Sequence, residues 1–82
     1  MAHFDVLVVD DDNATRDGLS VLLAHAGFTV DGANDGAVAL EKIERHDFGV
    51  VLLDIRLPGI GGLDVLARCV AKQPALKIIV MT

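Results

Sequence analysis

Three consecutive aspartates, Asp10, Asp11 and Asp12, end the apolar run in the segment VLVVDDDN. Neighbouring carboxylates repel each other, by about 4 kcal/mol for two charges about 4 Å apart at an effective dielectric constant near 20. A bound cation would offset this repulsion. Asp54 ends a second apolar run and Thr82 ends a third. Acids and a hydroxyl at the ends of such runs are groups that a metal-dependent reaction could use.

The elements that must position these residues follow from the apolar patterns. Short β-branched runs without helical periodicity predict strands over 5–9, 49–53 and 77–82, and a weaker run predicts a strand over 28–33. Segments with helical spacing separate these strands. The order β-α-β-α-β-α-β predicts a doubly wound α/β fold, with a parallel sheet and helices on both faces.

The three predicted helices have recognisable ends. The first stops before Gly27, which suits the C′ position of a helix. The second covers 35–45 with Asn34 as its N-cap, and the third covers 62–72 with Pro74 just beyond it. The side chains predicted to face inward are Leu19, Leu22, Leu23, Ala26, Val38, Ala39, Leu40, Ile43, Leu63, Leu66, Ala67 and Val70.

The predicted fold brings the candidate residues together, because ligands of an open parallel sheet bind beyond the carboxyl ends of its strands. Asp10, Asp11, Asp54 and Thr82 all lie at such ends. Clustered carboxylate oxygens suit Mg²⁺, which takes one or two carboxylates and keeps several waters. Asp12 is interpreted instead as the N-cap of the first helix.

Composition limits the class of protein. The 82 residues make at most one small domain, and 52% of them are hydrophobic, which is typical of a folded protein. A net charge of −5 argues against direct nucleic acid binding by this segment. Cys69 is the single cysteine, and no apolar run approaches membrane length. We therefore expect a cytoplasmic protein without membrane contact.

The segments VVDDDN, LLDIRLPGIGGLDVL and IIVMT, at fitting separations, resemble the receiver domain of two-component response regulators. Within that family, DIRLPGIGGLDVL is similar to the group attached to sigma-54-dependent transcription activators. The resemblance implies a flavodoxin-like receiver fold, with strand order 2-1-3-4 for the four strands of this chain. It also implies a phosphorylatable switch rather than a metabolic enzyme.

The resemblance assigns a role to each residue that matches a receiver motif. Asp54 would be the phosphoacceptor, phosphorylated by a sensor histidine kinase. Asp11 and Asp54 would bind Mg²⁺ directly, with Mn²⁺ as an alternative ion, while Asp10 would bind it through water and Arg56 through its backbone carbonyl. Thr82 would be the switch residue. Two readings of the Arg56 side chain stay open: it tunes access by phosphodonors, or it is simply solvated.

The resemblance also implies what a receiver contains beyond these motifs. Residues 1–82 would be the N-terminal two-thirds of a single receiver domain, without the family's lysine, fifth strand and last two helices. An effector domain in the parent chain, such as a transcription regulator, would be the output. The fourth strand would then be an exposed apolar edge, which predicts self-association of this chain.

Two other functions are alternatives. A Mg²⁺-dependent phosphohydrolase would use Asp54 as its nucleophile, but enzymes similar to the haloacid dehalogenases usually place a second acid where this chain has Arg56. A receiver-like interaction module would bind partners without phosphorylation. The set of acids at the predicted rim favours the switch over both.

Overall fold

Four strands form one parallel sheet in the computed structural model, which describes residues 3–57, 59 and 61–81. The strands are β1 (His3–Val9), β2 (Val30–Ala33), β3 (Asp47–Asp54) and β4 (Lys77–Met81). They are hydrogen-bonded in the order β2-β1-β3-β4, and every neighbouring pair is parallel. This arrangement confirms the predicted α/β class and the order 2-1-3-4.

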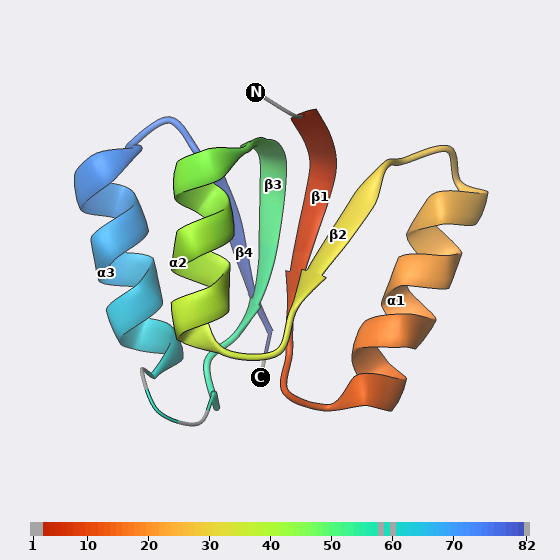
Figure 1. The fold of residues 1–82 in the computed structure, drawn as a ribbon, viewed down its shortest axis with the longest axis horizontal. Helices are drawn as coiled ribbons and strands as arrows, with labels where there is room; N and C mark the ends of the chain where they lie inside the picture. The colour runs from red at the N-terminus through yellow and green to blue at the C-terminus, as the bar shows by residue number, and fades with distance from the viewer. Residues whose placement is uncertain (1–2, 58, 60, 82) are drawn as a thin grey trace.

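Three helices connect the strands and cover both faces of the sheet (Figure 1). They are α1 (Asn13–His25), α2 (Gly36–Arg45) and α3 (Gly62–Lys72). Helices α2 and α3 lie together on one side, and α1 lies on the other. Across the part of the chain that the structure describes, none of the helices has the length and apolar character needed to span a membrane.

Local signals set the ends of α1 and α2. Asp12 is the N-cap of α1 as predicted, and its side chain accepts a hydrogen bond from the Thr15 N–H at 3.3 Å. Gly27 follows the C-cap with a φ of 98°, a conformation that glycine adopts without steric cost. The predicted N-cap of α2 was wrong by one residue. Asp35, and not Asn34, accepts the Val38 N–H at 2.8 Å.

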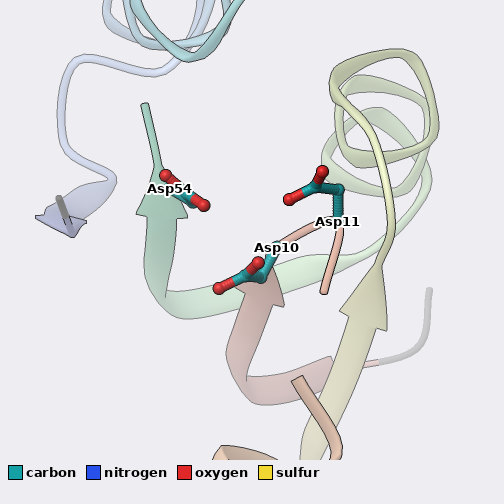
Figure 2. A group of neighbouring side chains, drawn as sticks. All are labelled: Asp10, Asp11 and Asp54. Atoms are coloured by element: carbon teal, nitrogen blue, oxygen red, sulfur yellow. The ribbon is translucent and has the colours of Figure 1, made fainter. Parts of the chain in front are cut away.

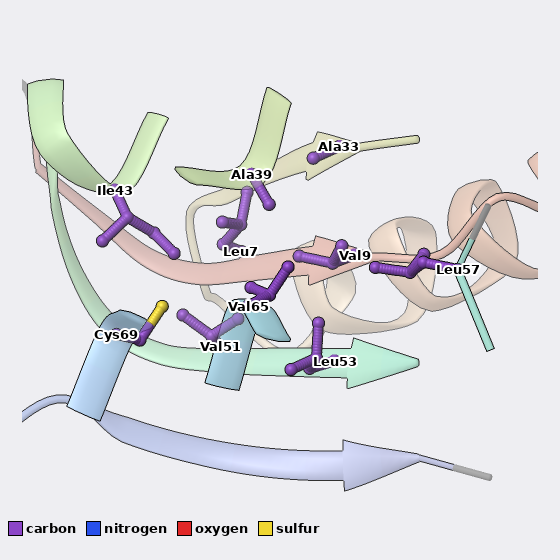
Figure 3. Close-up of a cluster of buried hydrophobic side chains, with 10 residues drawn as sticks. All are labelled: Leu7, Val9, Ala33, Ala39, Ile43, Val51, Leu53, Leu57, Val65 and Cys69. Carbon is purple, nitrogen blue, oxygen red and sulfur yellow. The ribbon is translucent and has the colours of Figure 1, made fainter. Parts of the chain in front are cut away.

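The hydrophobic core lies between the sheet and the pair α2/α3 (Figure 3). Alternate side chains of β1 and β3 point into it, because successive residues of a strand face opposite sides of a sheet. The buried members of this cluster are Leu7, Val9, Ala33, Ala39, Ile43, Val51, Leu53, Leu57, Val65 and Cys69. Cys69 is therefore a packing residue, as expected, and burial raises the pKa of its thiol.

The predicted inward face of α3 was only partly right, because Leu66 is half-buried and packs against the core but the other predicted residues are exposed. Val65 and Cys69 are buried, while Leu63 is 67% exposed and Val70 is exposed as well. Apolar side chains surround most of this helix, so periodicity alone does not define its rotation. The start of α3 is held at Gly62, which lies directly against Ile55. A Cβ on Gly62 would be 2.3 Å from the Ile55 Cα.

The predicted inward face of α1 was only partly right. Leu19 and Leu23 are half-buried, but Ala26 is exposed and Leu22 is 68% exposed. No residue of α1 is fully buried. The helix shares its side of the sheet with no other described helix (Figure 1), so its outer apolar residues have no neighbour to contact.

Candidate functional site

Three acidic side chains converge at the carboxyl end of the sheet. Asp10 directly follows β1, Asp11 follows it, and Asp54 is the last residue of β3. Figure 2 shows the three carboxylates around a common space. One ligating oxygen from each lies within 4.8 Å of the others. A pocket of about 520 Å³ includes this space and is lined by Asp10, Asp11, Asp12, Thr15, Asp54, Arg56 and Met81.

Asp10 is fixed in place by backbone hydrogen bonds. Its side chain is buried, with the residue only 7% exposed, and its Oδ1 accepts the Asp12 N–H at 2.9 Å. Its own N–H donates to the Ala33 carbonyl at 3.1 Å, which continues the pairing of β1 with β2. Asp11 is exposed at the mouth of the pocket. The two neighbouring acids therefore differ in burial, and Asp10 is the more constrained.

Asp54 is held at the end of β3 by the loop that follows. The Arg56 N–H donates to its Oδ1 at 2.9 Å, and the Ile55 N–H donates to the Met81 carbonyl at 3.3 Å. The close approach of Gly62 to Ile55 anchors this loop on the start of α3. Pro58, which lies between Asp54 and this glycine in the segment LLDIRLPGIGGLDVL, is outside the described residues.

The other two predicted site residues are Arg56 and Thr82, which do not belong to the acidic cluster. Arg56 lines the pocket, and its side chain is exposed. Its predicted metal contact through the backbone carbonyl stays a prediction. Thr82, the predicted switch residue, lies outside the described residues, although its neighbour Met81 lines the pocket and pairs with Asp54.

The donor set fits a magnesium ion. Mg²⁺ binds oxygen at about 2.1 Å, so two of its ligands lie at most about 4.2 Å apart. Asp10, Asp11 and Asp54 each offer one carboxylate oxygen, and these oxygens all lie within 4.8 Å of one another, which is close to that limit. Asp10 and Asp54 each have one oxygen engaged by a backbone N–H, which leaves the second oxygen of each available. These residues could hold a small hard cation.

Asp12 contributes charge to the rim without joining the cluster. Hydrogen bonds from the Thr15 hydroxyl and N–H lower the pKa of the Asp12 carboxyl below its ordinary value. Asp12 thus remains ionised at neutral pH. Its charge adds to the negative potential that would attract a cation to the pocket.

Arg16 is a residue of this region that the sequence pattern does not single out. Its Nη1 donates to the backbone carbonyl of Asp10 at 2.8 Å, and its Nη2 donates to Asn13 Oδ1 at 2.5 Å. An arginine one turn into an amphipathic helix reads as a surface residue. No sequence signal distinguishes this one.

Comparison with known sequences gives a consistent result. The family model described as "Response regulator receiver domain" matches residues 6–82. The transcriptional regulatory protein FixJ of Bradyrhizobium diazoefficiens is 40% identical over 77 residues, covering 94% of this chain and 38% of FixJ. A cyclic di-GMP phosphodiesterase of Thermotoga maritima is 39% identical over 77 residues, covering 94% and 20%. ZraR of Escherichia coli is 38% identical over 80 residues, covering 98% and 18%. The chain thus spans well under half of each relative.

Solved structures show the same fold. The response regulator protein TrrA of Thermotoga maritima, in complex with Mg²⁺-BeF, superposes with a TM-score of 0.89 at 38% identity, covering 98% of this chain and 68% of TrrA. TrrA in complex with the histidine kinase ThkA gives a TM-score of 0.89, covering 100% of this chain and 69% of that one.

Proposed function

This chain belongs to the response regulator receiver domain family, and on that premise we propose that it is a phosphoacceptor switch whose Asp54 is phosphorylated by a sensor histidine kinase. The observation that carries the proposal is the convergence of Asp10, Asp11 and Asp54, with ligating oxygens within 4.8 Å of one another. The structure of TrrA in complex with Mg²⁺-BeF supports a bound metal ion in this chain as well.

The proposed chemistry uses the two oxygens of Asp54 differently. Oδ1 accepts the Arg56 N–H and keeps a second lone pair for a cation, so Oδ2 is the oxygen free to attack phosphorus. A new O–P bond forms as the P–N bond of the kinase phosphohistidine breaks, and the electron pair of that bond returns to the imidazole. A bound Mg²⁺ would neutralise charge on the phosphoryl oxygens.

The proposed ligand set follows the same geometry. Asp11 and Asp54 bind Mg²⁺ directly, and Asp10 binds it through water because it is the most buried of the three. Arg56 adds its backbone carbonyl, and Mn²⁺ is an alternative ion for the same oxygen donors. Thr82 is proposed to contact the phosphoryl group and report its presence.

The proposed partners are a sensor kinase and an effector domain. The complex of TrrA with the histidine kinase ThkA supports the first. The names of FixJ and ZraR support a transcription regulator as the effector, and these proteins are much longer than the matched segment. Residues 1–82 are proposed to be the N-terminal two-thirds of the receiver domain. The narrower resemblance to sigma-54-dependent activators stays a prediction.

Self-association through β4 is a further part of the proposal. Strand β4 is an edge of the sheet in the described chain, and Ile79 on it is 54% exposed. Exposed apolar edge strands pair readily with other strands. We expect light scattering at micromolar concentration to give a mass above that of one 82-residue chain. A monodisperse monomer would remove this part of the proposal.

The metal site is tested by a Mg²⁺ titration followed through backbone amide NMR signals. We expect saturable shifts around the three acids in the wild-type protein. Asp11→Asn and Asp54→Asn should each weaken binding by about 10-fold or more, because each removes a charged ligand. Asp17→Asn is the matched control, since Asp17 is exposed and does not line the pocket. Equal binding by all four proteins would refute the site.

The phosphoacceptor is tested separately with a small acyl phosphate donor and Mg²⁺. Intact mass spectrometry of the wild-type protein should show one added phosphoryl group, and Asp54→Asn should show none. Binding of Mg²⁺ without any phosphoryl incorporation would favour the interaction module instead.

A further inference from the structure

Arg16 holds the peptide group that joins two of the three clustered acids. It lies in the first turns of α1, and its guanidinium returns over the end of β1 to donate to the Asp10 carbonyl at 2.8 Å. That carbonyl belongs to the peptide between Asp10 and Asp11. Because a peptide group is planar, fixing its carbonyl also fixes the direction in which the Asp11 N–Cα bond leaves. The orientation of the Asp11 side chain depends on that direction.

Gly32 on β2 provides the space that Arg16 needs. A Cβ on Gly32 would lie 3.1 Å from Arg16 Cδ, which is closer than ordinary contact, and 3.5 Å from Arg16 Cγ, which is an ordinary contact distance. The φ of Gly32 is not positive, so its value is clearance rather than backbone freedom. The Gly32 carbonyl in turn accepts a hydrogen bond from Lys42 Nζ on α2 at 2.6 Å. The backbone of Gly32, against which Arg16 packs, is therefore held in place by Lys42.

We propose that Arg16, seated on Gly32, is a positioning residue of the acidic site, which sets the spacing of the Asp10 and Asp11 carboxylates. The inference rests on the proposed function, because it takes these carboxylates to be the metal site. A guanidinium suits the task, since its planar fork donates to Asp10 and Asn13 at once. Residues that orient metal ligands from behind typically change metal affinity by about 10- to 100-fold when they are replaced.

The sign of the effect separates positioning from simple electrostatics. Removing a positive charge beside a cation site should strengthen cation binding if charge alone matters. If Arg16 positions the acids, Arg16→Gln should weaken Mg²⁺ binding by about 10-fold. Calcium binding should weaken less, because Ca²⁺ accepts flexible geometry whereas Mg²⁺ demands a near-ideal octahedron. The ratio of Mg²⁺ to Ca²⁺ affinity should therefore fall.

The experiment is a set of Mg²⁺ and Ca²⁺ titrations of the full chain, followed by amide NMR. Arg16→Gln is compared with Arg45→Gln, which makes the same change in net charge at the exposed end of α2. Arg16→Lys keeps the charge but loses the fork, so it should also bind Mg²⁺ more weakly than the wild type. Gly32→Ala keeps the guanidinium and displaces its stem, and should weaken Mg²⁺ binding by a smaller factor.

The outcomes are distinct. Weaker Mg²⁺ binding and a lower Mg²⁺/Ca²⁺ ratio in Arg16→Gln, with Arg45→Gln unchanged, support the inference. Unchanged or tighter Mg²⁺ binding in Arg16→Gln, or wild-type affinity in Arg16→Lys, overturns it while leaving the metal site intact. If Arg16→Gln does not fold, Gly32→Ala decides in the same way. No Mg²⁺ binding by the wild-type protein would overturn the proposed function itself.

Discussion

The two faces of the sheet carry helices of similar length that are buried to very different extents. Helix α1 has 13 residues and none of them is buried, whereas α2 and α3, with 10 and 11 residues, have six buried residues, which are Gly36, Ala39, Ile43, Gly62, Val65 and Cys69. Helices α2 and α3 also contact each other, since Gln73 donates to the Ile43 carbonyl at 3.2 Å. Burial thus depends on a neighbouring helix as much as on the sequence of the helix itself.

This difference matters because the acidic site is built from both faces. Asp54 and its loop are anchored on the closely packed face, through Gly62 and Ile55. Asp10 and Asp11 lead instead into α1, the weakly buried helix, where hydrogen bonds of Asp12 and Arg16 replace hydrophobic contacts. We expect the Asp54 side of the site to be rigid and the Asp11 side to rely on polar contacts.

The largest expected difference between the faces comes from removing a leucine on each. Leu7→Ala should lower the free energy of unfolding by about 3 kcal/mol, because it leaves a cavity in the core cluster. Leu22→Ala should cost less than about 0.5 kcal/mol, because that side chain is mostly exposed. Urea unfolding followed by circular dichroism measures both. Comparable losses would show that the α1 face is buried more than the structure indicates.

A smaller effect is expected where α3 contacts the loop after β3. Gly62→Ala should destabilise the protein by about 2 kcal/mol, because its new Cβ would overlap the backbone of Ile55 and the Asp54 carbonyl. Gly61→Ala is the matched control, since none of the described residues lies within 4 Å of a Cβ at that position. The same urea measurement applies, and a loss in the control equal to that in Gly62→Ala would contradict the packing argument.

A substitution in α1, the weakly packed helix, should be able to raise the free energy of unfolding. Gly18 lies inside α1, and a Cβ there would have no neighbour within 4 Å in the part of the chain that the structure describes. Gly18→Ala should therefore raise the free energy of unfolding by about 0.5 to 1 kcal/mol, because alanine favours a helix interior over glycine. Gly27→Ala, at a φ of 98°, should lower it instead. Thermal unfolding distinguishes the two, and stabilisation by Gly27→Ala would be inconsistent with the described helix end.

The smallest expected effect concerns the cap of α1 and depends on pH. Hydrogen bonds from Thr15 lower the pKa of Asp12 in the folded protein. An acid whose pKa is lower in the folded state than in the unfolded state stabilises the fold above its unfolded-state pKa. That contribution is lost as the pH falls through the folded-state pKa, which for Asp12 means below about pH 4. Thr15→Val removes the hydrogen bond from the Thr15 hydroxyl, so the variant should be less stable than the wild type at pH 7. Its free energy of unfolding should also fall less than that of the wild type when the pH is lowered. A gap from the wild type that is the same at pH 7 and pH 2 would contradict this.

The sequence predicted the fold well because its signals are local and repeated. Consecutive apolar residues such as Val6 to Val9 indicate a strand covered on both faces, and the alternation with helices dictates parallel pairing. The rotation of each helix was harder to predict. Leu63 and Val65 are both apolar, so the sequence pattern does not show which of them is buried. The close contact of Gly62 with Ile55, which holds the start of this helix, cannot be seen in that pattern.

The site was predicted to the extent that topology determines it. Asp10, Asp11 and Asp54 had to meet, because parallel strands bring their carboxyl ends to one edge. Arg16 could not be found in this way, since its role depends on a side chain that turns back over its own helix onto Gly32. Asn34 and Asp35 are both good N-caps, and the choice between them depends on where the backbone of β2 ends.

The burial of Cys69 allows local opening of this protein to be measured by thiol labelling. It is the only cysteine of a chain that has no Trp or Tyr, and it faces the core from α3. A thiol reagent added to the native protein should react with Cys69 only when the chain opens enough to expose it, since a buried thiol with a raised pKa reacts slowly. The labelling rate would therefore report how often the region of α3 around Cys69 opens, and the measurement needs no substitution in the chain.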